Sequence, residues 1–245
     1  MATFTTYANV LPDPNNSIAE TGGTTVNTVA GPGYASVKLG SEHKIMNTRT
    51  NSGRLISREL SGHKWNISIS YNPMTRDEFE PVFSFLAQQR GSMSPFFVSL
   101  PQYKAPRDTT FASFVASNTF ENKLLAAAGS TSLLIEHASY SVANGSAKPG
   151  DVFTVTDSSD SNHKKTYQVT RVETSAIYLS GTTAPSAIQQ RIQFIPALQR
   201  SVSAGSDVVF NDPKFRVVLS SDVSEYDLNT NNLYSFSLKL EEAQI

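Results

Sequence analysis

The stretch WNISISYNPMTRDEFEPVFSFLAQQRG, residues 65–91, contains two different periodicities and decides the class of fold. In residues 65–71 every second side chain is large and apolar, namely Trp65, Ile67, Ile69 and Tyr71. Strict alternation is typical of a strand with one buried and one wet face. The stretch YSFSLKL, residues 234–240, repeats this pattern, so we expect a second strand of the same kind near the end of the chain.

The second half of the stretch has a helical period. Apolar residues at positions i, i+3, i+4 and i+7 predict one buried stripe, formed by Phe79, Val82, Phe83 and Leu86. Thr75 and Glu78 have the spacing of a capping box, and Gly91 suits a left-handed helix stop. Because Pro81 has no amide, we expect either a first turn of separate character or a start near Glu80 with Pro81 as the first helical residue.

The rest of the chain reads as strands and turns. A strand at 96–100 would form, with 65–71, the floor beneath the helix. After residue 129, turn signals such as Asn144-Gly145 separate short strand-like runs. These runs are 132–136, 152–156, 166–173, 177–180, 192–199, 207–210 and 215–221. Residues 12–53 are rich in Asn, Thr, Ser and Gly and read as long loops or hairpin tips.

These patterns predict a mainly β protein: a β-sandwich or barrel-like main domain with one short amphipathic helix, plus an inserted small β-barrel. The main domain is expected to be discontinuous, comprising residues 1–125 together with 201–245. The inserted barrel is expected at 126–200.

Composition excludes several classes of protein. The 245 residues include 20 basic and 21 acidic ones, and this balance disfavours tight binding to nucleic acid or to acidic membranes. There are no cysteines, so disulfides, thiolate metal sites and cysteine nucleophiles are absent. The N-terminus has neither a basic region nor an apolar core typical of a secretory signal, and no apolar run is long enough to span a membrane.

Catalytic motifs are equally scarce. The histidines His43, His63, His137 and His163 lack the HExxH or HxH spacing of metal sites. Asp13, Asp77, Glu78 and Glu80 could in principle supply a glycosidase carboxylate pair, but three of them suit the first turns of the helix. The run DSSDSN (157–162) lacks the glycine and glutamate of a calcium loop, and GPG (31–33) lacks the lysine of a phosphate cradle. We therefore predict no enzyme, no catalytic or metal-binding residue and no cofactor.

Aromatic side chains leave an alternative function open. Six of them could stack on sugars, as in a carbohydrate-binding β-sandwich module of an adhesin: Trp65, Tyr71, Tyr103, Tyr140, Tyr167 and Tyr178. Most are in phase with the alternating strand patterns, which favours a role in the core.

The order W-x-I-x-I-x-Y, NPMTRDEFEPVFSFLAQQRG and PFFVSLP resembles the N-terminal part of tail-tip proteins of tailed bacteriophages, the distal tail, baseplate and minor tail proteins. The segments KPGDVFTV, KTYQVTRV and IQFIPALQRSVSAGSDVVFNDPKFRVVL are similar to the inserted barrel of these proteins and its return to the main domain. The resemblance covers residues 54–245.

This resemblance implies a structural virion protein that forms a ring, expected to be hexameric, at the distal end of the tail tube. Its expected partners are copies of itself, the tail tube protein, the baseplate hub and fibre or wedge proteins, with DNA only passing through the lumen. The expected location is the virion tail tip or baseplate, after assembly in the host cytoplasm. Residues 12–53 would clasp the adjacent subunit.

Overall fold

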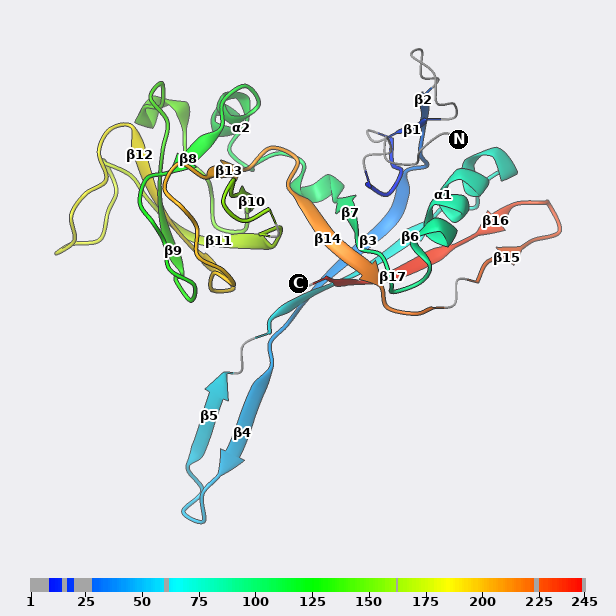
Figure 1. The fold of residues 1–245 in the computed structure, drawn as a ribbon, viewed down its shortest axis with the longest axis horizontal. Coiled ribbons are helices and arrows are strands. Elements are labelled where there is room, and N and C mark those ends of the chain that lie inside the picture. The colour runs from blue at the N-terminus through cyan, green and yellow to red at the C-terminus, as the bar shows by residue number, and fades with distance from the viewer. Residues whose placement is uncertain are drawn as a thin grey trace. The chain divides into compact units, whose positions relative to one another are not determined.

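The computed structural model describes residues 9–14, 17–19, 28–59, 62–161, 163–222 and 225–243, and it is mainly β, as predicted (Figure 1). The chain divides into two compact units. Unit 1 comprises Met1–Val98 and Arg216–Gln244, and unit 2 comprises Ser99–Phe215. No helix in the described part of the chain is both long and apolar enough to cross a membrane.

Unit 1 is built on a five-stranded sheet with the strand order β3-β6-β17-β14-β7. Its strands are β3 (Tyr34–Glu42), β6 (Lys64–Tyr71), β17 (Ser237–Glu242), β14 (Lys214–Leu219) and β7 (Phe96–Ser99). Both alternating stretches of the sequence lie at its centre, where Leu238 is paired with Ile69 and Leu240 with Ile67. All four of these side chains are buried, and the residues between them are exposed or partly exposed. This confirms the prediction that both stretches are strands with one buried face and one face towards solvent.

The helix α1 (Arg76–Gln89) follows β6 and covers one face of this sheet (Figure 1). Its contacts with the sheet are aromatic: Phe85 meets Phe96 of β7 edge to face, with ring centroids 5.5 Å apart. The buried side is formed by Phe79, Val82, Phe85, Leu86 and Gln89. Phe83, which the period assigned to the buried stripe, is only partly buried: it contacts the half-exposed Tyr226, whereas Phe85 is buried against Phe96.

The start of α1 corrects one prediction and confirms another. Thr75 is the N-cap, and its capping box with Glu78 is present, with the Thr75 amide donating to Glu78 Oε2 at 2.9 Å. The helix therefore begins well before Glu80, and Pro81 lies inside it. The missing amide removes one helical hydrogen bond, but the cap and the burial of Phe79 hold the first turn in place.

Residues 12–53 were expected to be long loops or hairpin tips, and they do include a hairpin tip at residues 50–54, but the loop prediction is wrong for the strands of the described part. These residues contain β3 and the first strand of a hairpin formed by β4 (Ile45–Arg49) and β5 (Leu55–Glu59). Two smaller two-stranded ribbons also belong to unit 1: β1 (Ser17–Ala19) with β2 (Thr28–Ala30), and β15 (Asp227–Leu228) with β16 (Tyr234–Ser235). Residues 20–27 lie outside the described part.

Unit 2 is a closed barrel with the strand order β10-β11-β12-β9-β8-β13. The strands are β8 (Phe120–Asn122), β9 (Ser132–Glu136), β10 (Val152–Thr156), β11 (Thr166–Glu173), β12 (Gln189–Ile195) and β13 (Asp207–Val209). The helix α2 (Thr109–Val115) and the 3-10 turns η2 (Pro101–Tyr103) and η3 (Val142–Asn144) complete the unit. Its core is strongly aromatic, with Phe111, Phe120, Phe153, Tyr167, Phe194 and Phe210 fully buried.

The barrel strands at 132–136, 152–156 and 166–173 coincide with the predicted ones. The predicted strand at 177–180 is wrong: Ile177, Tyr178 and Leu179 lie exposed in the loop between β11 and β12. The predicted insertion, 126–200, and unit 2 do not share boundaries, because β8 and β13, which close the barrel, lie outside that range.

Candidate interaction surface

The hairpin β4–β5, with the preceding Lys44, forms an arm (residues 44–59) that leaves the sheet of unit 1 (Figure 1). Five residue pairs hold its register, from Ile45 opposite Glu59 to Arg49 opposite Leu55. Every described side chain of both strands is exposed. The arm therefore has no hydrophobic core of its own, and an isolated two-stranded hairpin of this kind is at best marginally stable in water.

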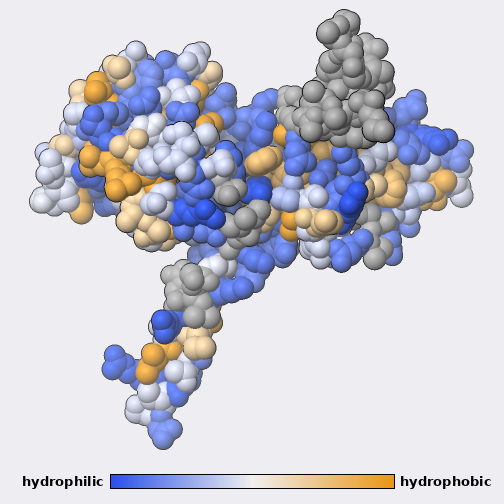
Figure 2. Space-filling view, in the orientation of Figure 1, coloured by the Kyte–Doolittle hydropathy of each residue, from blue (hydrophilic) through white to orange (hydrophobic). Residues whose placement is uncertain are grey.

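Apolar and basic side chains are interspersed along the arm. Ile45, Met46, Leu55 and Ile56 are between 49% and 61% exposed, and Figure 2 shows hydrophobic patches on the arm between hydrophilic ones. Four basic residues accompany them: Lys44, Arg49, Arg54 and Arg58. With Glu59 as the single acid, the arm carries a formal charge of +3, so the rest of the chain carries −4 of the total −1. Exposed apolar side chains on a charged arm are typical of an interaction site.

The two edges of the five-stranded sheet differ. The outer edge of β7 is covered, since the Leu11 amide donates to the Phe97 carbonyl at 2.8 Å and the Phe97 amide donates to the Asn9 carbonyl at 2.7 Å. By contrast, within the described chain β3 pairs only with β6, which leaves its outer edge without a neighbouring strand. A nine-residue edge strand is a template for pairing with another chain.

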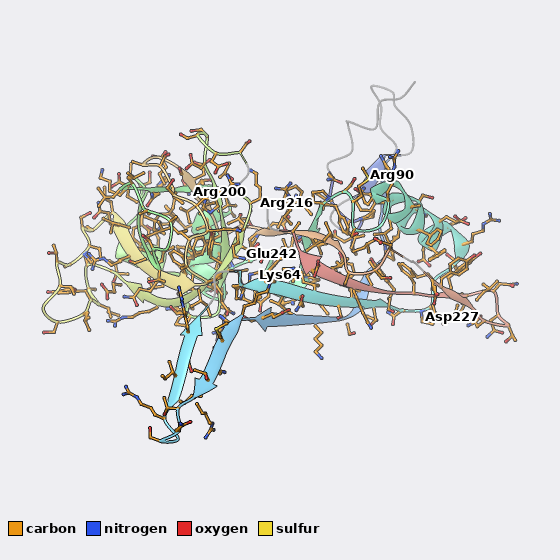
Figure 3. All side chains as sticks on the ribbon, turned by 60° about the horizontal axis from the view of Figure 1, so that its bottom comes forward. Lys64, Arg90, Arg200, Arg216, Asp227 and Glu242 are labelled. Atoms are coloured by element: carbon orange, nitrogen blue, oxygen red, sulfur yellow. The ribbon has the colours of Figure 1, made fainter. Side chains whose placement is uncertain are left out.

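The β15–β16 ribbon is a second exposed structure of unit 1, at the end of the unit opposite to the arm (Figure 3, where Asp227 is labelled). Tyr226 packs against Phe79 and Phe83 of α1, with ring centroids 5.0 and 5.5 Å away, yet remains 47% exposed. Leu228 is 53% exposed. Between and beside these two lie the exposed carboxylates of Asp227 and Glu225.

Two of the four histidines come together, which their spacing in the sequence did not predict. His43 and His63, on either side of the arm, have ring centroids 4.7 Å apart. Ser41 Oγ lies 2.8 Å from His63 Nε2 and 3.2 Å from His43 Nε2. His63 also packs on Trp65. The pair thus lies at the base of the arm. The described residues contain no group of three or more His, Cys, Asp or Glu side chains that could hold a metal ion.

The other two histidines and the acidic loop have structural contacts in the barrel. His163 is buried, its Nε2 lies 2.8 Å from the Tyr167 hydroxyl, and burial lowers its pKa. Asp157 accepts hydrogen bonds from the amides of Ser203 and Ser159. Burial alone would raise the pKa of Asp157, but these hydrogen bonds to the carboxylate lower it. His137 packs edge to face on Phe114.

The candidate carboxylates and the GPG stretch also have structural roles. Asp77 and Glu78 lie exposed and Glu80 partly exposed in the first turns of α1, whereas Asp13 is buried and its carbonyl accepts a hydrogen bond from the Gly31 amide. Gly31 lies against the backbone of Pro12, where an added Cβ would be 2.4 Å from the Pro12 carbonyl carbon. This glycine is therefore required by close packing and not by a phosphate.

The six aromatic residues considered for sugar binding do not form an exposed platform. Trp65, Tyr71, Tyr140 and Tyr167 are buried, and Tyr103 is partly buried. Only Tyr178 among the six is exposed, in the loop between β11 and β12. The surfaces that stand out for interaction are thus the arm, the β3 edge and the β15–β16 ribbon. The sequence signal for the arm was the pairing of basic with aliphatic residues in Lys44–Met46 and in Arg54–Ile56.

No family model matches the chain. A curated protein does: the distal tail protein pb9 of Escherichia phage T5 is 26% identical over 218 residues, which cover 87% of this chain and 93% of pb9. The chain is thus similar to a phage distal tail protein over most of its length. The similarity spans both units, and it confirms the resemblance to tail-tip proteins that the sequence motifs indicated. It supports a structural role in a phage tail.

Proposed function

We propose that this chain is a structural subunit of a phage tail that joins copies of itself into a ring, hexameric in the complete tail, at the distal end of the tail tube. In this proposal the ring connects the tube to the baseplate hub and to fibre or wedge proteins, and DNA passes through its lumen. The subunit performs no catalysis. It would be assembled in the host cytoplasm and remain in the virion.

The arm is the observation that carries this proposal. Its apolar side chains are about half exposed, so burying the remaining surface of each would stabilise a complex by about 1 kcal/mol, roughly half of the value for a fully exposed side chain. The unpaired edge of β3 adds a second surface of the same kind. When one patch of a subunit binds a different patch of its neighbour, the contact is heterologous. Such contacts close into a ring when the rotation between neighbouring subunits permits it.

The test is the size and shape of the purified chain. We expect light scattering after size-exclusion chromatography to give a closed oligomer, and negative-stain images to show rings. Replacing residues 45–58 by a short Asn-Gly turn is expected to leave folded monomers, whose single tryptophan, Trp65, reports an intact sheet. Antibody labelling of virions should place the chain at the tail tip. A full-length chain that stays monomeric and binds glycans would instead support the adhesin module.

A further inference from the structure

We infer that His43 and His63 form a chelating pair for a divalent transition-metal ion, of the class Cu²⁺, Ni²⁺ or Zn²⁺, at the base of the arm. Imidazole nitrogens are good ligands for these ions. Both histidines belong to one chain, so the inference goes beyond the proposed function and does not require the ring. The sequence did not predict this pair, because the two residues are far apart in the chain.

The register of β3 and β6 places the two histidines opposite each other. These strands pair as far as Glu42 opposite Lys64, so the next opposite pair is His43 and His63. Because side chains alternate along a strand, both rings share the face of Trp65. Directly opposite residues on one face of an antiparallel pair have Cβ atoms about 4.5–5.5 Å apart. The ring centroids of the two histidines are 4.7 Å apart, which is close enough for both rings to reach one ion.

The ring nitrogens of the pair converge on one point. The Nε2 atoms of His63 and His43 lie 2.8 and 3.2 Å from the same oxygen, Ser41 Oγ. A metal ion also requires converging nitrogens, at about 2.0–2.1 Å from each, and small rotations of the rings supply this distance. The described residues contain no group of three protein ligands, so water or the Ser41 hydroxyl would complete the coordination.

The two ligands differ in exposure, and both properties suit a binding site. His63 is buried and packs edge to face on the buried Trp65, with ring centroids 4.8 Å apart. This packing fixes one ligand before the ion arrives, which reduces the entropy that binding costs. His43 is exposed, so an ion can reach the pair from solvent.

The charges around the pair favour a cation. Glu42 and Lys64 point to the other face of the sheet, where Lys64 pairs with Glu241 at 3.6 Å. On the face of the histidines, the neighbouring strand β17 contributes Glu242, which is buried and accepts a hydrogen bond from the Trp65 amide at 3.2 Å. Figure 3, in which Lys64 and Glu242 are labelled, shows both at the base of the arm.

The position of the pair indicates what a bound ion would do. The β3–β6 ladder ends at Glu42 and Lys64, and the β4–β5 ladder begins at Ile45 and Glu59. Two residues separate the ladders on one strand and four on the other, so the register is broken between the sheet and the arm. An ion held by both histidines would link the two strands across this break and restrict the direction of the arm relative to the sheet.

The first experiment uses Trp65, the single tryptophan, as the reporter in the full-length chain. Cu²⁺ quenches indole emission at short range, and an ion bound by His63 would be close to the Trp65 ring. We expect saturable quenching that EDTA reverses and Zn²⁺ competes with. His43→Gln should weaken this binding at least about tenfold, and it should fold normally because the His43 side chain is exposed. His137→Gln, in the barrel, is the matched control and should leave the quenching unchanged.

The second experiment uses Zn²⁺, which does not quench the tryptophan. In an NMR titration of the full-length chain, the ring signals of His43 and His63 should shift, whereas those of His137 and His163 should not. Amide hydrogen exchange in β4 and β5 should slow, because the ion restrains both ends of the arm. The melting temperature of unit 1 should rise with the Zn²⁺ concentration, since a ligand that binds the folded state stabilises it. His43→Gln should show none of these changes.

The outcomes separate the site, its effect on the arm and the proposed function. Quenching that is absent from the wild-type chain, or equally strong in His43→Gln, would overturn the site. Shifts of both ring signals without any change in hydrogen exchange of the arm would support the site and overturn its effect on the arm. A chain that binds Cu²⁺ at the pair and yet stays monomeric would overturn the ring and leave this inference intact.

Discussion

Phe79, in the first turn of α1, stacks on Tyr234 of β16 with ring centroids 4.5 Å apart and ring planes within 12° of each other. The same ring meets Phe236 edge to face at 5.6 Å and contacts Tyr226 at 5.0 Å. One side chain thus joins the helix that follows β6 to the last strands of the chain and to the β15–β16 ribbon.

Replacing Phe79 by alanine is therefore expected to destabilise unit 1 by about 3–5 kcal/mol, since the ring is fully buried and the space cannot be refilled by its aromatic neighbours. The fluorescence of Trp65 during urea unfolding measures this loss. Phe83→Ala is the matched control and should cost much less, because Phe83 is only partly buried. Equal losses in the two variants would contradict the stacking role.

Replacing Ile56 by serine is expected to weaken assembly and to leave the stability of the monomer nearly unchanged. Its side chain is 49% exposed and packs on no core, so the unfolding free energy of the monomer should change by at most about 0.5 kcal/mol. Assembly should weaken, because the exposed apolar surface of the arm is lost. Urea unfolding and light scattering on the same sample separate the two effects, and a large loss of monomer stability would show that the arm packs on its own subunit.

Gly145 is expected to tolerate no side chain. Its φ of +76° is unfavourable for other residues, and an added Cβ would lie 2.7 Å from Asp108 Oδ1 and 3.0 Å from the Phe111 amide nitrogen. Gly145→Ala should destabilise unit 2 by at least about 1 kcal/mol. Gly129→Ala isolates the steric part, since Gly129 has a similar φ of +88° but open space around it. The prediction fails if calorimetry finds the two variants equally stable.

Asp108 caps α2 by accepting hydrogen bonds from the amides of Thr110 and Phe111 at 3.0 and 3.1 Å. These bonds, chiefly the one from Phe111, lower the pKa of the carboxyl group. Asp108→Ala is expected to cost about 1 kcal/mol of the unfolding free energy, whereas Asp108→Asn should retain most of the cap. Thermal unfolding at neutral pH measures both, and an equal loss in Asn and Ala would assign the effect to the Lys148 ion pair instead.

His163 should make the barrel sensitive to mild acid. Burial lowers its pKa below the ordinary value of 6.5, although the nearby Asp160 and Asp157 carboxylates act in the opposite direction. Below pH 6.5 this histidine is protonated in the unfolded chain but still neutral in the folded chain. The free energy of unfolding is therefore unaffected by His163 above pH 6.5, and it falls as the pH decreases towards the folded pKa.

The direct measurement for His163 is an NMR titration of the four histidine rings, in which its midpoint should lie below 6.5. Urea unfolding at about pH 5 and about pH 7 should show a loss of stability that is smaller in His163→Gln. The carboxyl groups of the barrel unit with lowered pKa values, Asp108, Asp157 and Glu136, begin to lose their stabilising effect only at lower pH. A His163 midpoint at or above 6.5 would contradict the prediction.

The sequence by itself determined those elements that depend only on residues close together in the chain. Strict alternation identified β6 and β17, because period 2 leaves only one way to bury every second residue. Turn residues on either side of short strand-like runs identified β9, β10 and β11. The Thr75–Glu78 capping box is also local and was visible in four residues. Similarly, the motif order around the helix was enough to indicate the tail-tip relatives, which the match to pb9 bears out.

Only the tertiary structure decided features that depend on distant partners. Pro81 stays inside α1 because Phe79 is held by Tyr234, 155 positions further along the chain. Likewise Phe85 and not Phe83 is buried, because Phe96 lies where Phe85 points. Most of all, the first part of the arm reads as a loop or hairpin tip in the sequence, since residues 12–53 are rich in Asn, Thr, Ser and Gly. Its strands form because β3 and β6 deliver both ends of the hairpin side by side, and this leaves the aliphatic side chains exposed for a partner.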